Sequence, residues 1–361
     1  AAIWKSRVAG LPEFGGELPV AALADEMLTP GDGQMKAMLV IAGNPVLSTP
    51  DGARVAQGLA GLEFVAALDM YVTATSRHAH IIIPPPSQLE RDDFPLVFSA
   101  LAVRNHARYC GPTFAPPANL HDDGDTLLAI AARIEKLRGR HARALGLATF
   151  RKTGFDPVVD VGLRAGPYGW RSSHKLSLRK LKAAPDGIDL GPLESRLPGA
   201  LHTAGRRVQL APAPLVADVE RLRASIDRPV PPLVLIGRRQ LRSNNSWMHN
   251  APRLVRGKSR CTLLVHPADA AAAGIASGER ARLRSRVGTL EAVTEVTDTI
   301  MPGVVSLPHG WGHDRHGAKL GVASAIDQAS LNDVTDATLV DALTGTSALS
   351  GVPVTLERAV S

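Results

Sequence analysis

Long hydrophobic stretches are absent from this sequence of 361 residues, 45% of which are hydrophobic, and its mean hydropathy is +0.01. No segment approaches the roughly 20 apolar residues that a membrane-spanning helix needs, so we expect no membrane span. The opening residues, Ala1-Ala2-Ile3-Trp4-Lys5, lack the basic-then-apolar order of a secretory signal peptide. These absences predict a globular protein of the cytoplasm.

Cysteine is scarce, because Cys110 and Cys261 are the only two and no CxxC pair is present. This excludes an iron–sulfur cluster or a structural zinc site built from this sequence. A disulfide between the two cysteines stays open, but a disulfide scaffold does not. Aromatic residues make up only 4% of the sequence, so its cores must consist mainly of Ala, Val, Leu and Ile.

Acidic residues are outnumbered, with 34 Asp and Glu against 41 Lys and Arg, which gives a formal net charge of +7. Scattered arginines suit the binding of anions such as pyrophosphate; a general arginine bias of the sequence is the alternative explanation. No basic run with interleaved aromatic residues is evident, so we do not expect nucleic acid as a partner. A GxGxxG motif after the first strand is also missing, which argues against a nicotinamide dehydrogenase.

Residues 1–145 have an α/β pattern. Apolar runs bounded by turn residues predict buried parallel strands at 35–42, 62–68 and 79–83, with helices at 53–60 and 125–137. Strands that alternate with helices imply a parallel sheet with crossover connections. Residues 146–230 are rich in Gly and Pro, and we interpret them as a long packed connection with one or two helices.

Residues 231–361 change to short strands, which are predicted at 233–236, 261–265, 280–285, 290–296 and 304–307, with one helix at 268–273. Gly274, Gly278 and Gly288 mark turns between them. Many short strands with few helices indicate a closed β-barrel. The fold class predicted is therefore α/β, with a parallel-sheet domain followed by a barrel.

An ordered series of motifs resembles the bis(molybdopterin guanine dinucleotide) oxidoreductases, the family of formate dehydrogenases, nitrate reductases and dimethyl sulfoxide reductase. The first motifs are Gly43-Asn44-Pro45, Asp69-Met70-Tyr71 with Thr75, Ile81-Ile82-Ile83-Pro84 and Glu90; the later ones are Ile236-Gly237-Arg238-Arg239, Asn244-Asn245-Ser246-Trp247, His266-Pro267-Ala268-Asp269, Pro308-His309-Gly310-Trp311 and Leu331-Asn332. The resemblance implies the third domain of the family, Rossmann-like, followed by its fourth domain, a double-psi β-barrel. It implies that residues 1–145 and 231–361 are these two domains.

The same resemblance implies a cofactor of two molybdopterin guanine dinucleotides per active site, with Mo or W. Nothing in the sequence corresponds to the family's cysteine-rich cluster region or to the domain that supplies the metal ligand. We therefore expect the iron–sulfur cluster and the metal ligand to lie in an N-terminal half or in a partner subunit. We name no metal-binding residue, and we expect the chain to be inactive alone.

The first candidate site follows the strand at 35–42. Gly43 permits close approach of a backbone to phosphate, Asn44 can donate and accept hydrogen bonds, and a helix start near Pro50 would favour a pyrophosphate. A plain strand-to-helix turn is the alternative, because Gly-Asn-Pro also suits a turn. The resemblance implies that Gly43, Asn44 and Pro45 hold one guanine dinucleotide tail.

Asp69 ends the second strand, where a carboxylate can accept both N1–H and N2–H of guanine. A helix N-cap is the alternative role. The resemblance implies the guanine role, and Tyr71 and Thr75 either pack beside the tail or belong to the core.

The second candidate site lies in the loop after the strand at 233–236, which concentrates hydrogen-bond donors and amides. The residues are Arg238, Arg239, Asn244, Asn245 and Ser246. A pterin carries many donors and acceptors and a phosphate, which such a loop suits. A solvated turn is the alternative, although Trp247 and His249 nearby argue against it. The resemblance implies that this loop lines the pterin.

The third constellation is His309-Gly310-Trp311-Gly312-His313, with His316 close behind. An independent metal site and a surface loop are both alternatives, but the glycines imply an irregular loop in which the imidazoles need not converge. The resemblance places His309, Gly310 and Trp311 against the pterin, with His309 a candidate for proton handling. Asn332 resembles a late cofactor-contacting asparagine, whereas Asp333 and Asp336 are expected to be exposed.

The function predicted is the cofactor-binding portion of an oxidoreductase that performs a two-electron reaction on a small molecule, formate dehydrogenase-like by analogy. The alternative is a separate, non-catalytic cofactor-binding subunit that pairs with an N-terminal catalytic partner. An electron-transfer protein is a further candidate partner.

Overall fold

The computed structural model describes residues 4–359, which form two compact units. The first unit combines the residues up to Ile83 with those from Ala213 onward, and the second contains Pro84–Pro212. These limits differ from the divisions at 145 and 230 that the sequence suggested. Every helix among the described residues falls short of the length and apolarity that a bilayer crossing needs.

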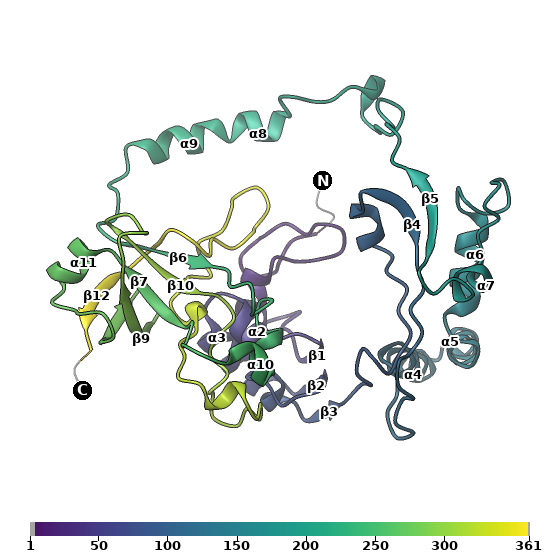
Figure 1. Cartoon of the computed structure of the whole chain (residues 1–361), viewed down its shortest axis with the longest axis horizontal. Helices are drawn as coiled ribbons and strands as arrows, with labels where there is room; N and C mark the ends of the chain where they lie inside the picture. The colour runs from purple at the N-terminus through teal and green to yellow at the C-terminus, as the bar shows by residue number, and fades with distance from the viewer. Residues whose placement is uncertain (1–3, 360–361) are drawn as a thin grey trace. The chain divides into compact units, whose positions relative to one another are not determined.

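A three-stranded parallel sheet opens the first unit, in the order β1 (Ala37–Ile41), β2 (Phe64–Leu68) and β3 (Ile81–Ile83) (Figure 1). The predicted strands at 35–42, 62–68 and 79–83 are confirmed. Helices η1 (Val20–Ala22), α1 (Leu23–Leu28), α2 (Pro45–Ser48), α3 (Gly52–Gly61) and η2 (Ser76–His78) accompany the sheet. The helix predicted at 53–60 is therefore confirmed as α3.

The core of this part lies between the sheet and α1 and α3. Val55 and Leu59 on α3 are 1% exposed and pack with Val65 on β2. A side chain in place of Gly58 would lie 2.6 Å from Cε of Met27, so α3 approaches α1 closely. The other face of the sheet leaves Leu39 and Ile41 more than a third exposed.

A curled seven-stranded sheet forms the rest of the first unit, in the order β11-β6-β10-β7-β9-β8-β12 (Figure 1). Its strands are β6 (Val234–Arg238), β7 (Thr262–Val265), β8 (Arg280–Arg284), β9 (Thr289–Val296), β10 (Val304–Pro308), β11 (Val352–Pro353) and β12 (Thr355–Arg358). The five strands predicted in this region are confirmed, and the helix predicted at 268–273 is α11 (Pro267–Ala272). The pairs β6–β10 and β7–β9 are parallel, and the other pairs are antiparallel.

Strands β11 and β12 lie at opposite edges of the sheet, although only Val354 separates them in the sequence. One short segment therefore pairs with β6 and with β8, and it joins the two edges. Buried residues alternate along β7, β8 and β9, as a period of two requires, whereas Val305–Pro308 of the central strand β10 are all buried. The fully buried set includes Leu235, Leu263, Val265, Leu283, Val305 and Leu307. The short helices η5 (Trp247–Asn250), α10 (Pro252–Val255), η6 (Ala323–Ala325) and η7 (Leu331–Asp333) lie in the connections.

Two acidic residues after β10 are less exposed than the sequence suggested. Asp336 is 4% exposed and accepts two hydrogen bonds from Arg286, at 2.6 and 2.7 Å. These bonds lower the pKa of Asp336 to about 2. Asp333 is half-buried and pairs with Arg315. The expectation of exposure was wrong because each carboxylate meets an arginine distant in the sequence.

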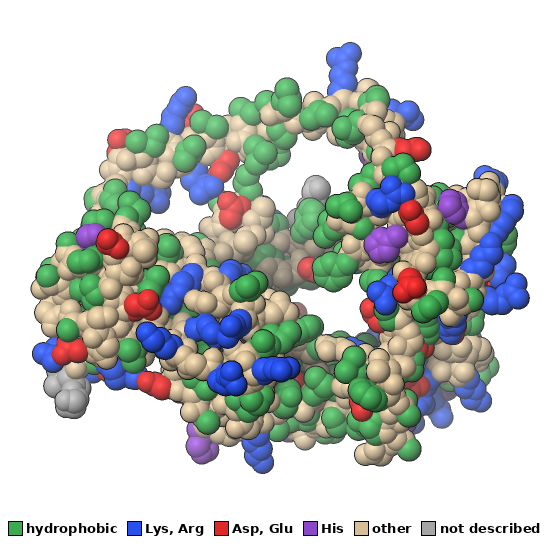
Figure 2. Space-filling view, in the orientation of Figure 1, with side chains coloured by type: hydrophobic (Ala, Val, Ile, Leu, Met, Phe, Trp, Pro, Cys, Tyr) green, Lys and Arg blue, Asp and Glu red, His purple; other side chains and the backbone are tan. Residues whose placement is uncertain are grey.

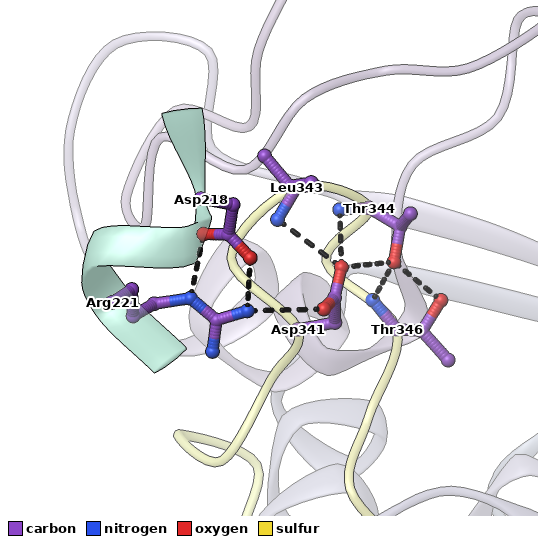
Figure 3. A network of polar contacts seen from close by, with 6 residues as sticks. All are labelled: Asp218, Arg221, Asp341, Leu343, Thr344 and Thr346. Atoms are coloured by element: carbon purple, nitrogen blue, oxygen red, sulfur yellow. Dashed lines mark hydrogen bonds and ion pairs between the residues drawn. The ribbon is translucent and has the colours of Figure 1, made fainter. Parts of the chain in front are cut away.

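Helices α8 (Ala213–Ala217) and α9 (Val219–Ile226) lead into the curled sheet, and an ion-pair network holds α9 to the loop at 341–346 (Figure 3). Arg221 donates two hydrogen bonds to Asp218, at 2.8 and 2.6 Å, and lies 3.7 Å from Asp341. The carboxylate of Asp341 accepts hydrogen bonds from the backbone N–H of Leu343 and from the backbone N–H and hydroxyl of Thr344. The hydrogen bonds from Thr344 are the main cause that lowers the pKa of Asp341. Because the network is exposed to solvent, it adds little to the free energy of unfolding, and its main effect is to hold α9 beside the loop at 341–346.

The second unit consists of helices and one antiparallel strand pair. Its elements are η3 (Phe98–Leu101), β4 (Arg104–Ala107), α4 (Asp123–Leu137), α5 (His141–Thr153), α6 (Asp156–Ala165), α7 (Leu178–Lys182), β5 (Ile188–Pro192) and η4 (Ala204–Arg206). The helix predicted at 125–137 is confirmed as α4. Between residues 146 and 230, however, the structure has more helices than the one or two predicted, as well as β5. Frequent Gly and Pro residues interrupt the periodic patterns of these short elements, so the sequence did not indicate them.

Truncation of a core leucine tests the curled sheet. Leu263 is fully buried, so Leu263→Ala should lower the free energy of unfolding by about 2–5 kcal/mol through lost apolar contact and a residual cavity. Leu241→Ala is the control, because Leu241 is 100% exposed and its loss should change stability by less than about 0.5 kcal/mol. Urea unfolding followed by circular dichroism measures both. Equal effects of the two variants would contradict this core.

Candidate functional site

The candidate pterin loops follow two parallel strands that are neighbours in the curled sheet. Pro308, the last residue of β10, is paired with Arg238, the last residue of β6. The backbone N–H of His309 donates to the carbonyl of Arg238 at 3.0 Å. The loop that begins at Arg239 and the loop that begins at His309 therefore leave the sheet side by side at its carboxyl edge, where ligands of parallel sheets commonly bind.

The two loops touch through Gly310, which has a φ of +93°. A Cβ atom at this position would lie 2.3 Å from the carbonyl oxygen of Asn245. Only glycine combines this backbone conformation with so close an approach. Asn244 and Asn245 also have positive φ values, +41° and +60°, which asparagine tolerates better than most residues. The contact joins loop 239–246 and loop 309–313 into one surface.

The two arginines at the end of β6 have different surroundings. Arg239 is exposed and donates to the side-chain oxygen of Asn245. Arg238 instead turns into the sheet, where its guanidinium donates to the carbonyls of Ser306 and Thr262 and to the hydroxyl of Thr262. Burial lowers the pKa of Arg238. These hydrogen bonds occupy the guanidinium of Arg238 within the curled sheet, which argues against the predicted contact of Arg238 with the cofactor.

His309 lies half-buried beside Arg239. Burial and the positive charge of Arg239 lower the pKa of His309, which keeps the imidazole neutral near pH 7. A neutral imidazole can accept a proton at one ring nitrogen and donate one from the other.

Two histidines and a tryptophan form a buried cluster beneath this surface. His249 on η5 is 1% exposed, and its ring stacks on that of Trp311 at 3.8 Å between centroids. Nδ1 of His249 lies 3.0 Å from Nε2 of His313, which is a hydrogen bond. Sequence reasoning noted His249 and His313 but missed their pairing, since they are separated by 64 residues.

Three buried ring nitrogens in this cluster have no hydrogen-bond partner among the described residues. They are Nε2 of His249, Nε1 of Trp311 and Nδ1 of His313. Buried polar atoms are nearly always paired, and an unpaired one costs about 1–3 kcal/mol. The cluster therefore places three buried polar nitrogens without partners within and next to loop 309–313.

The charge around the loops is strongly positive. The segment from residue 238 to residue 260 contains seven cationic side chains and no acidic one: Arg238, Arg239, Arg242, Arg253, Arg256, Lys258 and Arg260. Among residues 4–359, no ion pair involves any of them. Figure 2 shows Lys and Arg side chains gathered over this part of the first unit, around α10. Unpaired cations beside the loops favour an anionic ligand such as a dinucleotide.

The second group of candidates lies at the carboxyl edge of the parallel sheet. Gly43 and Asn44 follow β1, and Asp69 follows the neighbouring strand β2. The hydroxyl of Thr75 donates to the side-chain oxygen of Asn44 at 2.7 Å and accepts the backbone N–H of Val46 at 3.0 Å. Thr75 thus fixes the Asn44 amide with its oxygen inward. This pair was not predicted, although Thr75 belonged to the motif.

Asp69 is partly buried and accepts a hydrogen bond from the backbone N–H of Tyr71 at 3.2 Å. Burial raises the pKa of Asp69, and the backbone groups of Tyr71 and Met70 only partly offset it. Asp69 is not a helix N-cap, because the next helical turn, η2, begins at Ser76. Further hydrogen-bond donors would stabilise the charged form of this carboxylate, and the Watson–Crick edge of guanine would supply them.

The expectation of a pyrophosphate at the helix start near Pro50 is wrong. Helix α3 begins at Gly52, and the carboxylate of its N-cap residue, Asp51, accepts from the backbone N–H of Arg54. Asp51 is 8% exposed, and its own N–H donates to the carbonyl of Thr335. A buried carboxylate at this helix start repels a phosphate instead of attracting one.

Asn332 is also separate from the candidate surface. It is 1% exposed, its side-chain N–H donates to the carbonyl of Leu47 at 2.7 Å, and its oxygen accepts from Thr335 at 2.9 Å. Asn332 therefore links the curled sheet to α2 of the parallel sheet and is removed from the cofactor-contacting set. The same link is made by Gly312, where a Cβ would lie 3.1 Å from Leu47 and 2.7 Å from Ser330.

Neither cysteine forms a disulfide, and burial raises the pKa of Cys261 to about 11, so its thiol is inert. Among residues 4–359 no cluster of three or more His, Cys, Asp or Glu side chains could hold a metal ion. The loop with His309, His313 and His316 does not converge on a metal site, because His313 turns to His249.

Comparison with known proteins gives a family model, curated relatives and similar solved structures. Residues 233–353 match the family model "Molydopterin dinucleotide binding domain". The chain is 22% identical to trimethylamine-N-oxide reductase of Haemophilus influenzae, over 82% of this chain and 39% of that protein. It is 23% identical to dimethyl sulfoxide/trimethylamine N-oxide reductase of Rhodobacter capsulatus, over 92% of this chain and 43% of that protein.

Among solved structures, acetylene hydratase from Pelobacter acetylenicus has a similar fold, with a TM-score of 0.69 at 17% identity, over 95% of this chain and 47% of that one. The chain spans less than half the length of each of these proteins.

These matches first define the class, a molybdopterin dinucleotide-binding protein of mixed α/β fold. Residues 233–353 thus match a molybdopterin dinucleotide-binding domain, and the chain is similar to the C-terminal portion of the bis(molybdopterin guanine dinucleotide) oxidoreductases, the family that the motif series predicted. The predicted cofactor, molybdopterin guanine dinucleotide with molybdenum, is confirmed at the level of the family.

A substitution at Gly310 tests the contact between the two loops. Gly310→Ala should open loop 239–246, because the new Cβ overlaps the Asn245 carbonyl, and trypsin should cleave after Arg239 and Arg242 about tenfold faster. Gly278→Ala is the matched control, since Gly278 has a φ of +90° but no atom within 4 Å of its Cβ position. If both variants are cleaved at the wild-type rate, the loops do not depend on Gly310.

Proposed function

We propose that this chain holds a molybdopterin guanine dinucleotide through the two groups of residues described above. Arg239, Asn244, Asn245 and Ser246, with His309, Gly310 and Trp311, contact the pterin and its phosphate. Gly43, Asn44, Pro45 and Asp69 hold a guanine nucleotide tail. The observation that carries the proposal is the Gly310–Asn245 contact, which joins the two loops of the matched domain into one donor-rich, cationic surface.

Guanine selection is assigned to Asp69. A carboxylate accepts N1–H and N2–H of guanine together, whereas adenine presents no such pair of donors. Burial raises the pKa of Asp69, so further donors from a bound guanine would stabilise its ionised form. Asn44 is held by Thr75 with its amide N–H groups free for the nucleotide.

The whole protein is proposed to perform a two-electron oxidation or reduction of a small molecule. The bound cofactor, with Mo or W and two dinucleotides per site, would supply the redox chemistry. This chain orients the cofactor, excludes water behind it with the His249–Trp311 stack, and presents the neutral His309 as a proton acceptor. A formate dehydrogenase-like reaction is one member of this class; relatives named as trimethylamine-N-oxide and dimethyl sulfoxide reductases show that the class includes other substrates.

The metal ligand and the iron–sulfur cluster are proposed to come from an N-terminal half or from a partner subunit, with an electron-transfer protein as a further partner. The scarcity of cysteine and the match to less than half of each relative support this division. Under the second candidate function, a separate cofactor-binding subunit, the same residues hold the dinucleotide and the partner performs the chemistry. One relative is itself named as a molybdopterin-binding-like subunit of menaquinone reductase.

The fold details expected from the family are also proposals. The parallel pairs β6–β10 and β7–β9, and the segment 352–358 that joins both edges, support a double-psi barrel. The parallel sheet β1–β3 supports a Rossmann-like domain. In this arrangement the nucleotide lies at the carboxyl edges of both sheets.

Removal of the Asp69 carboxylate tests the guanine assignment. Asp69→Ala should weaken GDP binding by at least about tenfold and leave ADP binding unchanged, because two charge-assisted hydrogen bonds to guanine are lost. Isothermal titration of the purified chain measures both ligands. Glu63→Gln is the control, since Glu63 precedes the same strand at the opposite edge and is exposed. Equal GDP affinity in Asp69→Ala and the wild type would remove Asp69 from the site.

A further inference from the structure

The buried cluster of His249, Trp311 and His313 is more polar than a core requires. All three side chains are less than 5% exposed, and apolar residues could fill the same space without unpaired nitrogens. The stack and the hydrogen bond together tie η5 to loop 309–313. Packing alone therefore does not explain why two histidines and a tryptophan occupy these positions.

The two imidazoles share one hydrogen. In the contact between Nδ1 of His249 and Nε2 of His313 at 3.0 Å, one nitrogen must donate and the other accept. The tautomer of one ring thus fixes the tautomer of the other. Protonation of both rings would place two donors face to face and break the contact.

The surroundings keep the pair neutral. Burial is the main cause that lowers the pKa of His249 to about 4, and charge on His313 or His309 lowers it further. Burial also lowers the pKa of His313, opposed first by the backbone of Gly310 and then by Asp314; the Gly310 backbone also opposes the shift of His249. The other elements packed against the pair contribute neutral groups: Gln328 accepts the N–H of Gly312, and Ser324 donates to the carbonyl of His313.

The pair acts on the proposed site through one loop. Trp311, which His249 stacks on, directly follows Gly310, and Gly310 packs against Asn245. The position of Trp311 therefore decides whether loops 239–246 and 309–313 remain joined.

We propose that His249 is a positioning residue of the dinucleotide site: as a neutral imidazole bonded to His313 and stacked on Trp311, it holds loop 309–313 against Asn245, and protonation of both imidazoles releases that loop. The link to the dinucleotide rests on the proposed function, whereas the positioning itself does not. The sign follows from the depressed pKa. The restraint is complete above the ordinary histidine pKa of about 6.5 and is lost as the pH falls toward about 4.

Two substitutions separate hydrogen bonding from stacking. His249→Asn places an amide where Nδ1 lies, so it can keep the bond to His313 but cannot become protonated. His249→Phe keeps an aromatic stack on Trp311 and removes the bond. His202→Asn is the matched control, because His202 is exposed and lies in the other unit.

The first readout is hydrogen–deuterium exchange of the amides at 309–313 in the ligand-free chain. Protection should fall about tenfold in His249→Phe at pH 7 and remain within about twofold of wild type in His249→Asn. In the wild type, protection at these amides should also fall between pH 6 and pH 4, and in His249→Asn it should not. Wild-type protection in His249→Phe, or the same pH dependence in His249→Asn, would overturn the proposal.

The second readout is the fluorescence of Trp311 in a chain with Trp4, Trp170 and Trp247 changed to Phe. A protonated imidazole stacked on the indole quenches its emission, so we expect quenching with a midpoint near pH 4 that His249→Asn abolishes. Circular dichroism at each pH separates this change from unfolding. Emission that titrates identically with and without His249 would contradict the proposal.

Binding of the soluble pterin neopterin to the same variants separates the positioning role of His249 from the proposed binding of a pterin. Weaker binding by His249→Phe at pH 7, with His249→Asn near wild type, supports positioning of a pterin site. Altered exchange without any neopterin binding by the wild type leaves the loop positioning intact and counts against the proposed function.

Discussion

The site depends on one short segment in which side chains would not fit. At Gly310 the chain runs against the Asn245 carbonyl, and at Gly312 it runs against Leu47 and Ser330. The first contact joins the two loops at the carboxyl edge of β6 and β10, and the second joins the curled sheet to the parallel sheet. A Cβ at either position would separate surfaces that the proposed dinucleotide site needs together. Loop 309–313 therefore connects the loops and the two sheets of the first unit.

Around this segment, polar residues divide into those that build the protein and those left available for a ligand. Arg238, Asn332 and Asp51 are saturated by internal partners. Arg239, Asn244 and Asp69 retain unused hydrogen-bonding capacity, and the cations of residues 238–260 lack acidic partners. Residues that bind an anionic, donor-rich ligand are expected to have such unused capacity, because their polar groups become fully paired only when the ligand binds.

The sequence predicted the regular elements well. Period-two and short apolar runs located β1, β2, β3 and five strands of the curled sheet, since burial imposes those patterns directly. It predicted one or two helices between residues 146 and 230, fewer than the structure has, and it did not predict α1, α5, β4, β5, β11 or β12. Motif order also identified the family correctly, because many weak matches in one order are together specific.

Individual side chains were harder to predict than elements. Arg238 and Arg239 are adjacent in the same motif, but Arg238 points into the sheet and Arg239 into solvent. The alternation of side chains along a strand explains this difference, whereas the motif does not indicate it. The pairing of His249 with His313, and of Asp336 with Arg286, joins residues 50 or more positions apart. Such contacts depend on the tertiary fold, so no local pattern contains them.

The most direct test of the central claim is the nucleotide and pterin content of the chain itself. The chain would be expressed in a host that makes molybdopterin guanine dinucleotide, purified, and analysed for released pterin and guanine nucleotide. We expect both to copurify with the folded chain in about equal amounts, because each dinucleotide contains one pterin and one guanine nucleotide. A folded chain that carries neither would contradict the assignment of these loops to the cofactor.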